Sequence, residues 1–486
     1  MAENSEKIST NQLLNKQACL KNSKKGVIPW LMYFCAFSAD LPLITLGSCF
    51  VWGSPAIPKL RSNDTEINPL GEPITPFQTS IVVSASEFTM IFLLSVMAKV
   101  SNFLGRRKCL ILNSLLFVIF LSAVAVAKNI YLYYIFFLLN GINLAGVFIN
   151  STIYNSEVAD DKSRAWMGCI DGLCLPLGTL LAFIFGTFTS IRVYTLLCAT
   201  PALIYLLLSF YTVESPMYLL YKNKNEEALK VLIDLRKHKN MDEIQSEFNR
   251  MKDLSIEVNH QRNNYCDIFS TRSSRKALLI ASSLCFFQQT TGVSNILAYA
   301  GTIFTEAGAS LSGNTVSILM GFMQIIVNII VVSSVNKIGR RRLILASVLG
   351  CSLSTFTLGV YFYLKSYSSV DHFNWLPVVC ALTFMSSYAL GLGPIIPSYM
   401  GELFGSETRA MGVAIATAID TTIAFSVNFG FPLLMTQLGI FGCMFIYSGF
   451  SLIGFLTLFV VLPETTGKSF NEIQVLLKRK SIQNFR

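Results

Sequence analysis

Charge and histidine are scarce in this sequence. Only 14% of its 486 residues are charged and three are histidine, whereas 52% are hydrophobic. A soluble protein carries about 25% charged residues. The mean hydropathy of +0.54 is correspondingly high. This composition excludes an ordinary soluble domain and predicts a membrane protein.

Features of disulfide scaffolds, secreted proteins and enzymes are also missing. The twelve Cys residues fall mostly inside apolar stretches, where they serve as small apolar side chains rather than as a disulfide framework. Residues 1–28 are polar and lack a cleavable signal pattern, so the first apolar run is expected to act as an uncleaved insertion signal. The polar segments contain no nucleophile–base pair, metal-ligand cluster or phosphate-binding loop. We therefore expect no enzyme activity, no cofactor and no metal site.

Apolar runs of about 20 residues recur along the chain, and this is the length a helix needs to cross ~30 Å of hydrocarbon. The membrane offers no water to the backbone, so each run must be a helix. The runs are 29–52, 77–97, 109–127, 130–152, 166–190, 193–212, 276–299, 313–335, 343–365, 374–400, 411–434 and 439–462. We predict an all-α membrane protein with twelve transmembrane helices.

Positive charge gathers on one side of these predicted helices. With the N-terminus inside, 33 of the 38 Lys and Arg residues fall in cytoplasmic segments. Those outside are Lys59, Arg61, Lys128, Arg192 and Lys365. The asymmetry predicts that both termini are cytoplasmic. Attraction to anionic lipids of the inner leaflet accounts for the net charge of +10, so no nucleic-acid partner is expected.

Three features of the first six runs repeat in the last six. The basic loop Asn102-Phe-Leu-Gly105-Arg106-Arg107 is echoed by Asn336-Lys-Ile-Gly339-Arg340-Arg341. Glu157 and Arg164 are matched by Glu402 and Arg409, and Glu214 by Glu464. These repeats predict two related six-helix halves, with a substrate site between them near the middle of the membrane. We expect the ten repeated charged residues to form a cytoplasmic gate.

The predicted domains follow from this repeat. They are a cytoplasmic tail (1–28), a first half (29–212), a cytoplasmic linker with amphipathic surface helices (213–275), a second half (276–462) and a cytoplasmic tail (463–486). Asn63-Asp64-Thr65 lies in the longest outer loop and fits a glycosylation site at Asn63.

The repeated motifs resemble those of the sugar porter family of the major facilitator superfamily. Pro463-Glu-Thr-Thr-Gly467 is close to the PETKG motif of that family, and Phe287-Gln-Gln-Thr-Thr-Gly292 matches its FQQxTG motif. Ser54-Pro55-Ala56 and Met400-Gly401-Glu402 look most like insect facilitated trehalose and hexose transporters. The resemblance covers about 29–475 and implies the major facilitator fold and a small sugar as substrate.

A neutral sugar requires neutral donors and acceptors at membrane depth, and a Gln amide supplies both. Gln288, Gln289 and Gln324 lie inside apolar runs, where polar groups face either a cavity or a partner helix. The resemblance adds Ser294 or its neighbour Asn295. Gly391, Gly393 and Pro394 predict a flexible, partly unwound segment in the tenth helix. We predict that these residues form the substrate site and its hinge.

The chain also departs from the family pattern. The family's sugar-binding residues in helices 5, 10 and 11 fall on Gly172, Ala389, Pro397 and Asp420-Thr421. Its usual gate acids fall on Asn102 and Asn336, its helix 4 arginine on Phe137, and the arginine of its PESPR motif on Met217. Loss of both partners of an ion pair avoids leaving one charge unpaired. The chain is therefore expected to gate and select in its own way.

Four acids, Asp40, Glu87, Asp171 and Asp420, lie within the apolar runs without an intramembrane cation, which makes them functional candidates. The position at which proton-coupled family members carry Asp is Cys49 here. We therefore expect facilitated diffusion of trehalose, glucose or a related hexose through the plasma membrane, without an obligate partner subunit. The alternatives are a proton-coupled sugar symporter and a sugar receptor that does not transport.

Overall fold

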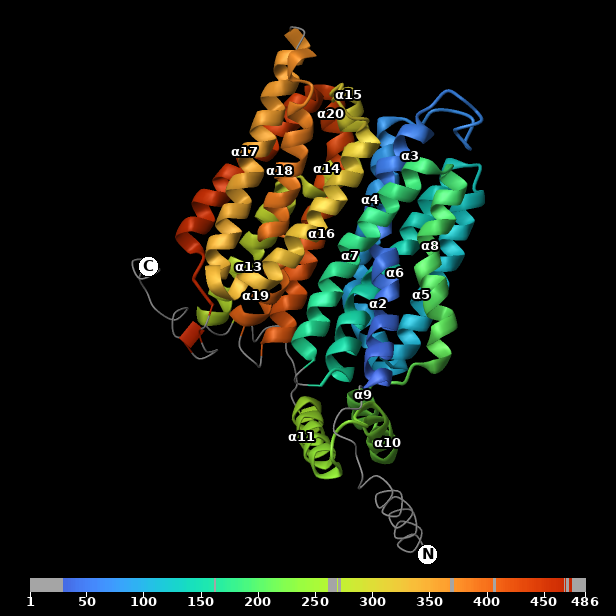
Figure 1. Cartoon of the computed structure of the whole chain (residues 1–486), viewed down its shortest axis with the longest axis vertical. Helices are drawn as coiled ribbons and strands as arrows, with labels where there is room; N and C mark the ends of the chain where they lie inside the picture. The colour runs from blue at the N-terminus through green and yellow to red at the C-terminus, as the bar shows by residue number, and fades with distance from the viewer. Residues whose placement is uncertain are drawn as a thin grey trace, which may run out of the picture.

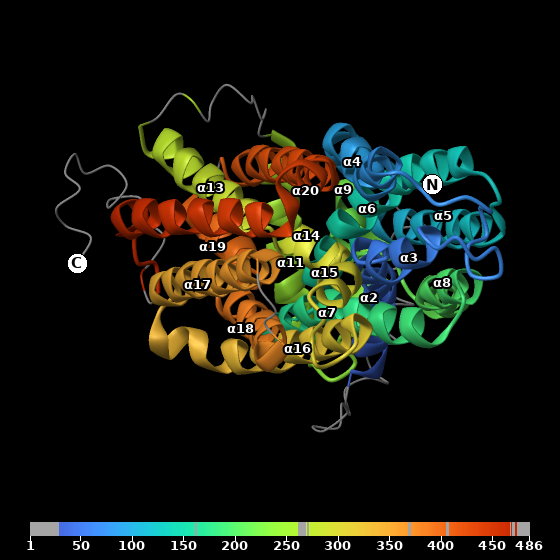
Figure 2. The ribbon, with the colours of Figure 1, turned by 90° about the horizontal axis from the view of Figure 1, so that it is seen from above.

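A computed structural model describes residues 29–160, 163–260, 269, 272–367, 371–404, 408–466, 468 and 472–473. Within these ranges the chain is helical and divides into two bundles that stand side by side, with three further helices at one end (Figures 1 and 2). The predicted N-terminal tail, most of the predicted C-terminal tail and part of the predicted linker lie outside the described residues. The all-α prediction is confirmed.

The first bundle contains the first six predicted spans. Its helices are α2 (Trp30–Phe50), α3 (Gly53–Leu60), α4 (Pro76–Leu104), α5 (Arg106–Val126), α6 (Ile130–Val158), α7 (Arg164–Phe188), α8 (Ile191–Leu208) and the 3-10 turn η1 (Ser209–Tyr211). α4 begins with a capping box, in which Thr75 Oγ1 accepts from the Gln78 amide and Gln78 Oε1 accepts from the Thr75 amide. Pro76 follows at the first helical position, where its missing amide hydrogen costs nothing.

Three amphipathic helices follow the first bundle at the end where Figure 1 places α9 to α11. They are α9 (Pro216–Tyr221), α10 (Asn225–Leu235) and α11 (Met241–His260). Their apolar faces form a small core of their own, which includes Leu219, Leu232 and Phe248. The spacing of apolar residues along 225–236 predicts this helix, and the structure agrees.

The second bundle contains the last six predicted spans. Its elements are α13 (Arg272–Thr290), α14 (Val293–Ala298), α15 (Ala300–Glu306), α16 (Gly313–Ile338), α17 (Arg340–Tyr367), η2 (Asp371–Phe373), α18 (Leu376–Leu390), α19 (Ile395–Leu403) and α20 (Arg409–Val461). Large apolar side chains on the outer faces of both bundles are exposed, among them Phe92, Leu207, Leu353 and Leu456. Such a continuous apolar surface fits a lipid environment rather than water.

Ten helices in the described ranges are long and apolar enough to cross a membrane. One of them, Met411–Val461, contains two predicted spans, because Gly439 has non-helical angles (φ 69°, ψ 176°) and turns the chain. The seventh predicted span, 276–299, is not among the ten because it is divided between α13 and α14 at Gly292. These two cases reconcile the ten helices with the twelve predicted ones.

The two bundles touch along two pairs of helices and at one end. α4 packs against α20, and α7 packs against α16. At the end opposite α9 to α11, α3 meets α15, and Ser54 Oγ accepts a hydrogen bond from the Gly301 amide at 3.2 Å.

Candidate functional site

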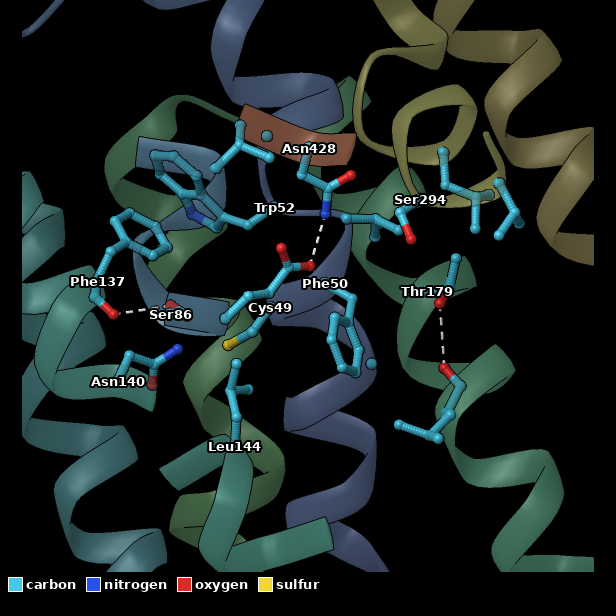
Figure 3. A pocket seen from close by; sticks show the side chains of 18 of the residues that line it. Cys49, Phe50, Trp52, Ser86, Phe137, Asn140, Leu144, Thr179, Ser294 and Asn428 are labelled. Carbon is cyan, nitrogen blue, oxygen red and sulfur yellow. Dashed lines mark hydrogen bonds between the residues drawn. The ribbon is translucent and has the colours of Figure 1, made fainter. Parts of the chain in front are cut away.

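A cavity of about 240 Å³ lies between the two bundles (Figure 3). The first bundle lines it with residues that include Trp52, Glu87 and Asn140. The second bundle contributes Gln289, Ser294, Gln324, Tyr388 and Asn428. Phe50 and Phe137 add aromatic surface. A mixed wall of aromatic rings and polar amides is typical of a small-molecule site.

Gln289 is the most connected of the predicted site residues in this wall. Its Nε2 donates to Asp420 Oδ1 at 2.9 Å, and its Oε1 accepts from Ser294 Oγ at 3.1 Å. The break at Gly292 (φ 80°) makes the second contact possible, since it turns the chain back toward Gln289. A side chain at position 292 would also collide with the ring of Tyr447. The glycine of the FQQxTG motif is therefore required by the backbone.

Gln324 and Ser294 also line the cavity, whereas Gln288 and Asn295 do not. Gln288 Nε2 donates to Tyr388 Oη at 3.1 Å and to the Leu392 carbonyl at 2.9 Å. Asn295 is fully buried, and its Nδ2 donates to Tyr447 Oη at 2.7 Å. In this conformation Gln288 and Asn295 join helices of the second bundle. Their predicted role in sugar binding stays a prediction.

Glu87 and Asn428 are cavity residues that the site prediction omitted. Asn428 Nδ2, on α20, donates to Glu87 Oε1, on α4, at 2.6 Å, and a dashed line from Asn428 marks this bond in Figure 3. The bond joins the two bundles across 341 positions of sequence. The sequence marks Glu87 as an isolated acid in an apolar run, but nothing in the sequence marks Asn428 as its partner in the other half.

The acids Asp40 and Asp171 lie away from this cavity wall. Asn155 Nδ2 donates to both, at 2.6 Å to Asp40 Oδ1 and at 2.7 Å to Asp171 Oδ1. All three residues belong to the first bundle, on α2, α6 and α7. The amide thus holds two carboxyl groups together in the protein interior.

The predicted gate residues form one cluster in each bundle. In the first, Arg106 Nε lies 3.1 Å from Glu157 Oε2, and Ser215 Oγ also donates to Glu157. Glu214 Oε1 accepts from the Arg107 amide at 3.0 Å. A carboxylate there is favoured by the positive end of the α5 dipole. The cluster closes the connection between α4 and α5.

The second bundle repeats this arrangement. Arg340 pairs with Glu402, and its amide donates to Thr466 Oγ1 at 2.9 Å. Thr466 Oγ1 in turn donates to Glu464 Oε1 at 2.7 Å. Arg341 donates to the carbonyl of Phe459 at 2.7 Å. These ion pairs each join residues of one bundle, so in this conformation they stabilise the halves rather than connect them.

Two arginines of the predicted gate differ from the rest. Arg164 Nε donates to the Ser156 carbonyl at 3.3 Å. Arg409 opens α20, and its side chain is outside the described part of the structure. The gate role of the ten residues as a set remains a prediction.

The predicted hinge coincides with a break in helical structure. α18 ends at Leu390 and α19 begins at Ile395, so Gly391, Gly393 and Pro394 lie between them. A side chain at position 391 would approach the Leu343 carbonyl to 2.6 Å. The break and the close approach of α17 both suit glycine.

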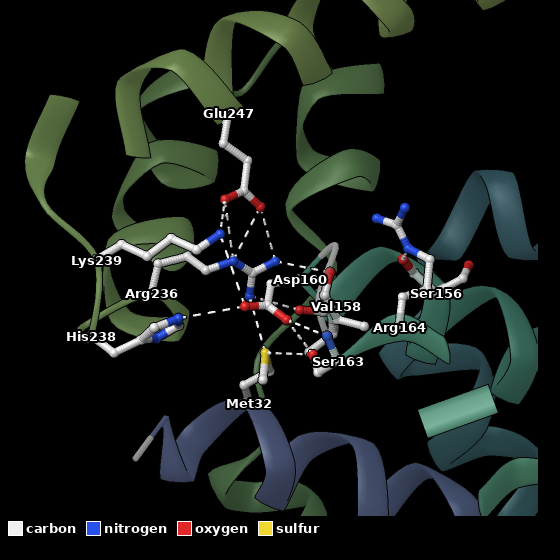
Figure 4. A network of polar contacts seen from close by, with 11 residues as sticks. Met32, Ser156, Val158, Asp160, Ser163, Arg164, Arg236, His238, Lys239 and Glu247 are labelled. Carbon is white, nitrogen blue, oxygen red and sulfur yellow. Dashed lines mark hydrogen bonds and ion pairs between the residues drawn. The ribbon is translucent and has the colours of Figure 1, made fainter. Parts of the chain in front are cut away.

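A polar network attaches α10 and α11 to the first bundle (Figure 4). Arg236 is 1% exposed and donates to the carbonyls of Val158 and Ala159 at the end of α6. It also pairs with Glu247 at 3.0 Å. Burial alone would raise the pKa of Glu247, but the charges of Arg236 and Lys239 outweigh it and lower that pKa. The network therefore depends on an ionised Glu247.

Asp160 belongs to the same network, since its Oδ2 lies 3.5 Å from His238 Nε2 and 3.9 Å from Lys239 Nζ. Burial again acts to raise the pKa of Asp160, but hydrogen bonds from Ser163 and the charge of Lys239 lower it. The linker is thus docked by several charge-assisted bonds rather than by apolar contact alone.

Two six-helix bundles enclosing a central cavity define a membrane transporter of the major facilitator fold. Within this class, the chain belongs to the family described as "Sugar (and other) transporter", whose model matches residues 26–477. The resemblance to sugar porters expected from the motifs is confirmed. This is a family of transporters and not of enzymes.

Individual relatives lie at moderate distance. The chain is 25% identical over 452 residues to the facilitated trehalose transporter Tret1 of Drosophila willistoni, and 25% identical over 453 residues to trehalose transporter 1 of Drosophila melanogaster. Each match covers 92% of this chain but only 51% and 52% of these relatives. The chain thus spans about half of their length.

Solved structures show the same fold. The xylose transporter XylE from E. coli in an inward open conformation superposes with a TM-score of 0.76 at 20% identity, over 92% of this chain and 99% of the other. The proton:xylose symporter XylE bound to 6-bromo-6-deoxy-D-glucose gives a TM-score of 0.71 at 20% identity, over the same 92% and 99%.

Proposed function

We propose that this protein transports a small sugar such as trehalose, glucose or a related hexose by facilitated diffusion, with the halves 29–212 and 276–462 rocking about the central cavity. The observation that carries this proposal is the position of Gln289, Ser294 and Gln324 in a cavity between the two bundles. Neutral amides and hydroxyls next to aromatic rings suit the many hydroxyls and the apolar ring face of a sugar. The trehalose transporters among its relatives support the choice of substrates.

Facilitated diffusion is preferred because the proton-binding position of coupled family members is Cys49, which lines the cavity here. A proton-coupled symporter is the second candidate. It is favoured by two carboxyl groups at the cavity, since Glu87 lines it and Asp420 binds the lining residue Gln289.

Uptake by the purified full chain in proteoliposomes tests the proposal. Radiolabelled trehalose and glucose are offered with and without an inward proton gradient. Saturable uptake and counterflow that are indifferent to the gradient support a facilitator, whereas uptake that is concentrated by the gradient supports the symporter. Saturable binding without uptake would instead make the protein a receptor and overturn transport.

We further propose that the protein resides in the plasma membrane with both termini in the cytoplasm and Asn63 outside. Asn63 is exposed in the loop between α3 and α4, at the end opposite α9 to α11. Treatment of the cell-expressed protein with an N-glycosidase should reduce its mass, and Asn63→Gln should remove this shift. A protease cleavage site is introduced at each terminus in turn. Resistance of both sites to protease added outside intact cells would support cytoplasmic termini.

A further inference from the structure

Among the buried atoms of the cavity-lining residues that lack a hydrogen-bond partner in the described structure, acceptors outnumber donors. Three buried acceptors of these lining residues have no partner in the described structure, namely Glu87 Oε2, Gln324 Oε1 and Asn428 Oδ1. The Asn140 amide nitrogen is a buried donor without a partner. A buried acceptor without a donor destabilises the protein unless a ligand or water supplies one. These buried acceptors favour a ligand that offers hydrogen-bond donors.

Negative charge adds to this preference. Glu87 lines the cavity and is only 8% exposed, and the residues lining the cavity include no Lys, Arg or His. Asp420 is not a lining residue, but its Oδ1 accepts a hydrogen bond from the amide nitrogen of Gln289. A ligand in this cavity therefore meets a carboxyl group without a compensating cation from the protein. The carboxyl group favours a positively charged donor over a neutral one.

Only one oxygen of Glu87 is hydrogen-bonded within the described residues. Its Oε1 is held by Asn428 Nδ2 at 2.6 Å, which fixes the carboxyl group between the two bundles. Its Oε2 is buried and has no hydrogen-bond partner within the described residues. The family resemblance places a sugar-binding glutamate in helix 10, where this chain has Ala389, so the acid in this cavity comes from the opposite bundle.

From these contacts we propose that Glu87 binds the substrate and that its free oxygen selects a sugar carrying a protonated amino group over the same sugar carrying a hydroxyl. This inference rests on the proposed sugar transport and adds a preference for amino sugars among its substrates. A hydrogen bond to a charged group is stronger than one between neutral groups. The expected preference is about tenfold, which corresponds to about 1.4 kcal/mol.

Competition in the uptake assay tests this selection. Labelled glucose uptake into proteoliposomes is inhibited with glucose itself and with its 2-amino, 3-amino and 6-amino derivatives, at about pH 6.5, below the range of ~7.7–8.0 in which simple α-amino groups titrate. At least one amino sugar should inhibit at about tenfold lower concentration than glucose. N-acetylglucosamine, which keeps the nitrogen but loses the charge, should lose this advantage over glucose.

Glu87→Gln is the central variant, because the amide keeps an acceptor for Asn428 and removes the charge. In this variant the inhibitory concentrations of the amino sugars should lie within about twofold of that of glucose, instead of about tenfold below it. Glu66→Gln, on the exposed outer loop, removes the same charge far from the cavity and should leave the preference unchanged. Asn428→Ala removes the bond that fixes the Glu87 carboxyl group but keeps its charge, so the preference should fall less than in Glu87→Gln. Equal loss in Glu87→Gln and Asn428→Ala would show that Glu87 acts only as a contact between the halves.

The outcomes separate this inference from the proposed function. Glucose uptake without preference for any amino sugar in the unmodified protein would overturn the role of Glu87 and leave sugar transport intact. This comparison needs no variant, so it stands if Glu87→Gln does not fold. Absence of saturable uptake of glucose, trehalose and the amino sugars would overturn the proposed function itself.

Discussion

Arg106 on α5 and Glu157 on α6 face each other in the interior of the first bundle, with Arg106 Nε 3.1 Å from Glu157 Oε2. Their side chains are 5% and 14% exposed. Removal of one partner leaves the other charge buried and unpaired. We therefore expect Arg106→Ala or Glu157→Ala to lower the free energy of unfolding by about 3–5 kcal/mol.

A double-mutant cycle checks this expectation. Loss of both charges in Arg106→Ala/Glu157→Ala should destabilise the protein by less than the two single changes together, because no unpaired charge remains. Thermal unfolding in detergent gives the three values. Additive losses would mean that the two side chains do not act as a pair.

Gln289→Ala should weaken sugar transport. The change removes a cavity amide and deprives both Asp420 and Ser294 of their hydrogen bonds. Loss of a hydrogen bond between a neutral amide and a sugar hydroxyl corresponds to about 0.5–1.5 kcal/mol, so the half-saturation concentration should rise by about two- to tenfold. Initial rates of uptake over a range of sugar concentrations measure it.

Gln288→Ala is the matched change one residue away. The sequence alone predicts that Gln288 binds sugar, whereas its amide is occupied by Tyr388 and Leu392 in the structure. A change in stability with unchanged half-saturation would assign Gln288 to helix packing. A rise equal to that of Gln289→Ala would restore it to the sugar site.

Gly105→Ala should destabilise the first bundle. Gly105 has φ 102° and ψ 156°, a region that is open only to glycine, and a side chain there would collide with the carboxylate of Glu214. The strain is expected to reduce the free energy of unfolding by about 1–3 kcal/mol. Gly168→Ala within α7 meets no atom within 4 Å and should instead be neutral or stabilise by up to ~1 kcal/mol. Thermal unfolding of the two variants side by side gives the comparison.

Acid should release the linker helices. Arg236 and Lys239 overcome the effect of burial and hold the pKa of Glu247 below its usual 4.5. A lowered folded pKa contributes stability that is complete above the unfolded pKa and is lost as the pH falls through the folded one. Docking of α10 and α11 should therefore be unchanged at neutral pH and weaken below about pH 4.3. Amide hydrogen exchange of these helices measures the docking.

Glu247→Gln provides the control for the acid effect. It should raise exchange in α10 and α11 already at neutral pH and flatten the acid dependence that remains. The dependence left over would come from Asp160, whose pKa is also lowered. An unchanged exchange profile in this variant would contradict the assignment of the network to linker docking.

Local patterns in the sequence were sufficient to predict the helices and part of the site. Apolar runs of spanning length fix where helices form, and the isolated amides Gln289 and Gln324 mark residues that the structure places at the cavity. The glycine and proline residues likewise predict the helix break between Gly391 and Pro394.

Contacts between distant segments could not be read in the same way. Asn428 is one polar residue among several on α20, and only the packing of α4 against α20 brings it to Glu87. Gln288 and Gln289 are neighbours of the same residue type, so their different partners depend on the direction of each side chain around α13. The pattern of apolar residues alone does not specify that direction.

The turn at Gly439 couples the movements of the two parts of α20 in the second bundle. Gly439 divides α20 into two limbs, 409–438 and 440–461, with no loop between them. We therefore expect a movement of the limb that carries Asn428 to move the limb that carries Tyr447. The rings of Phe431 and Tyr447 stack across the same pair of limbs. An opening of the contact at Asn428 would consequently be passed to Asn295, which holds the Tyr447 hydroxyl, and so to the broken helix beside the cavity.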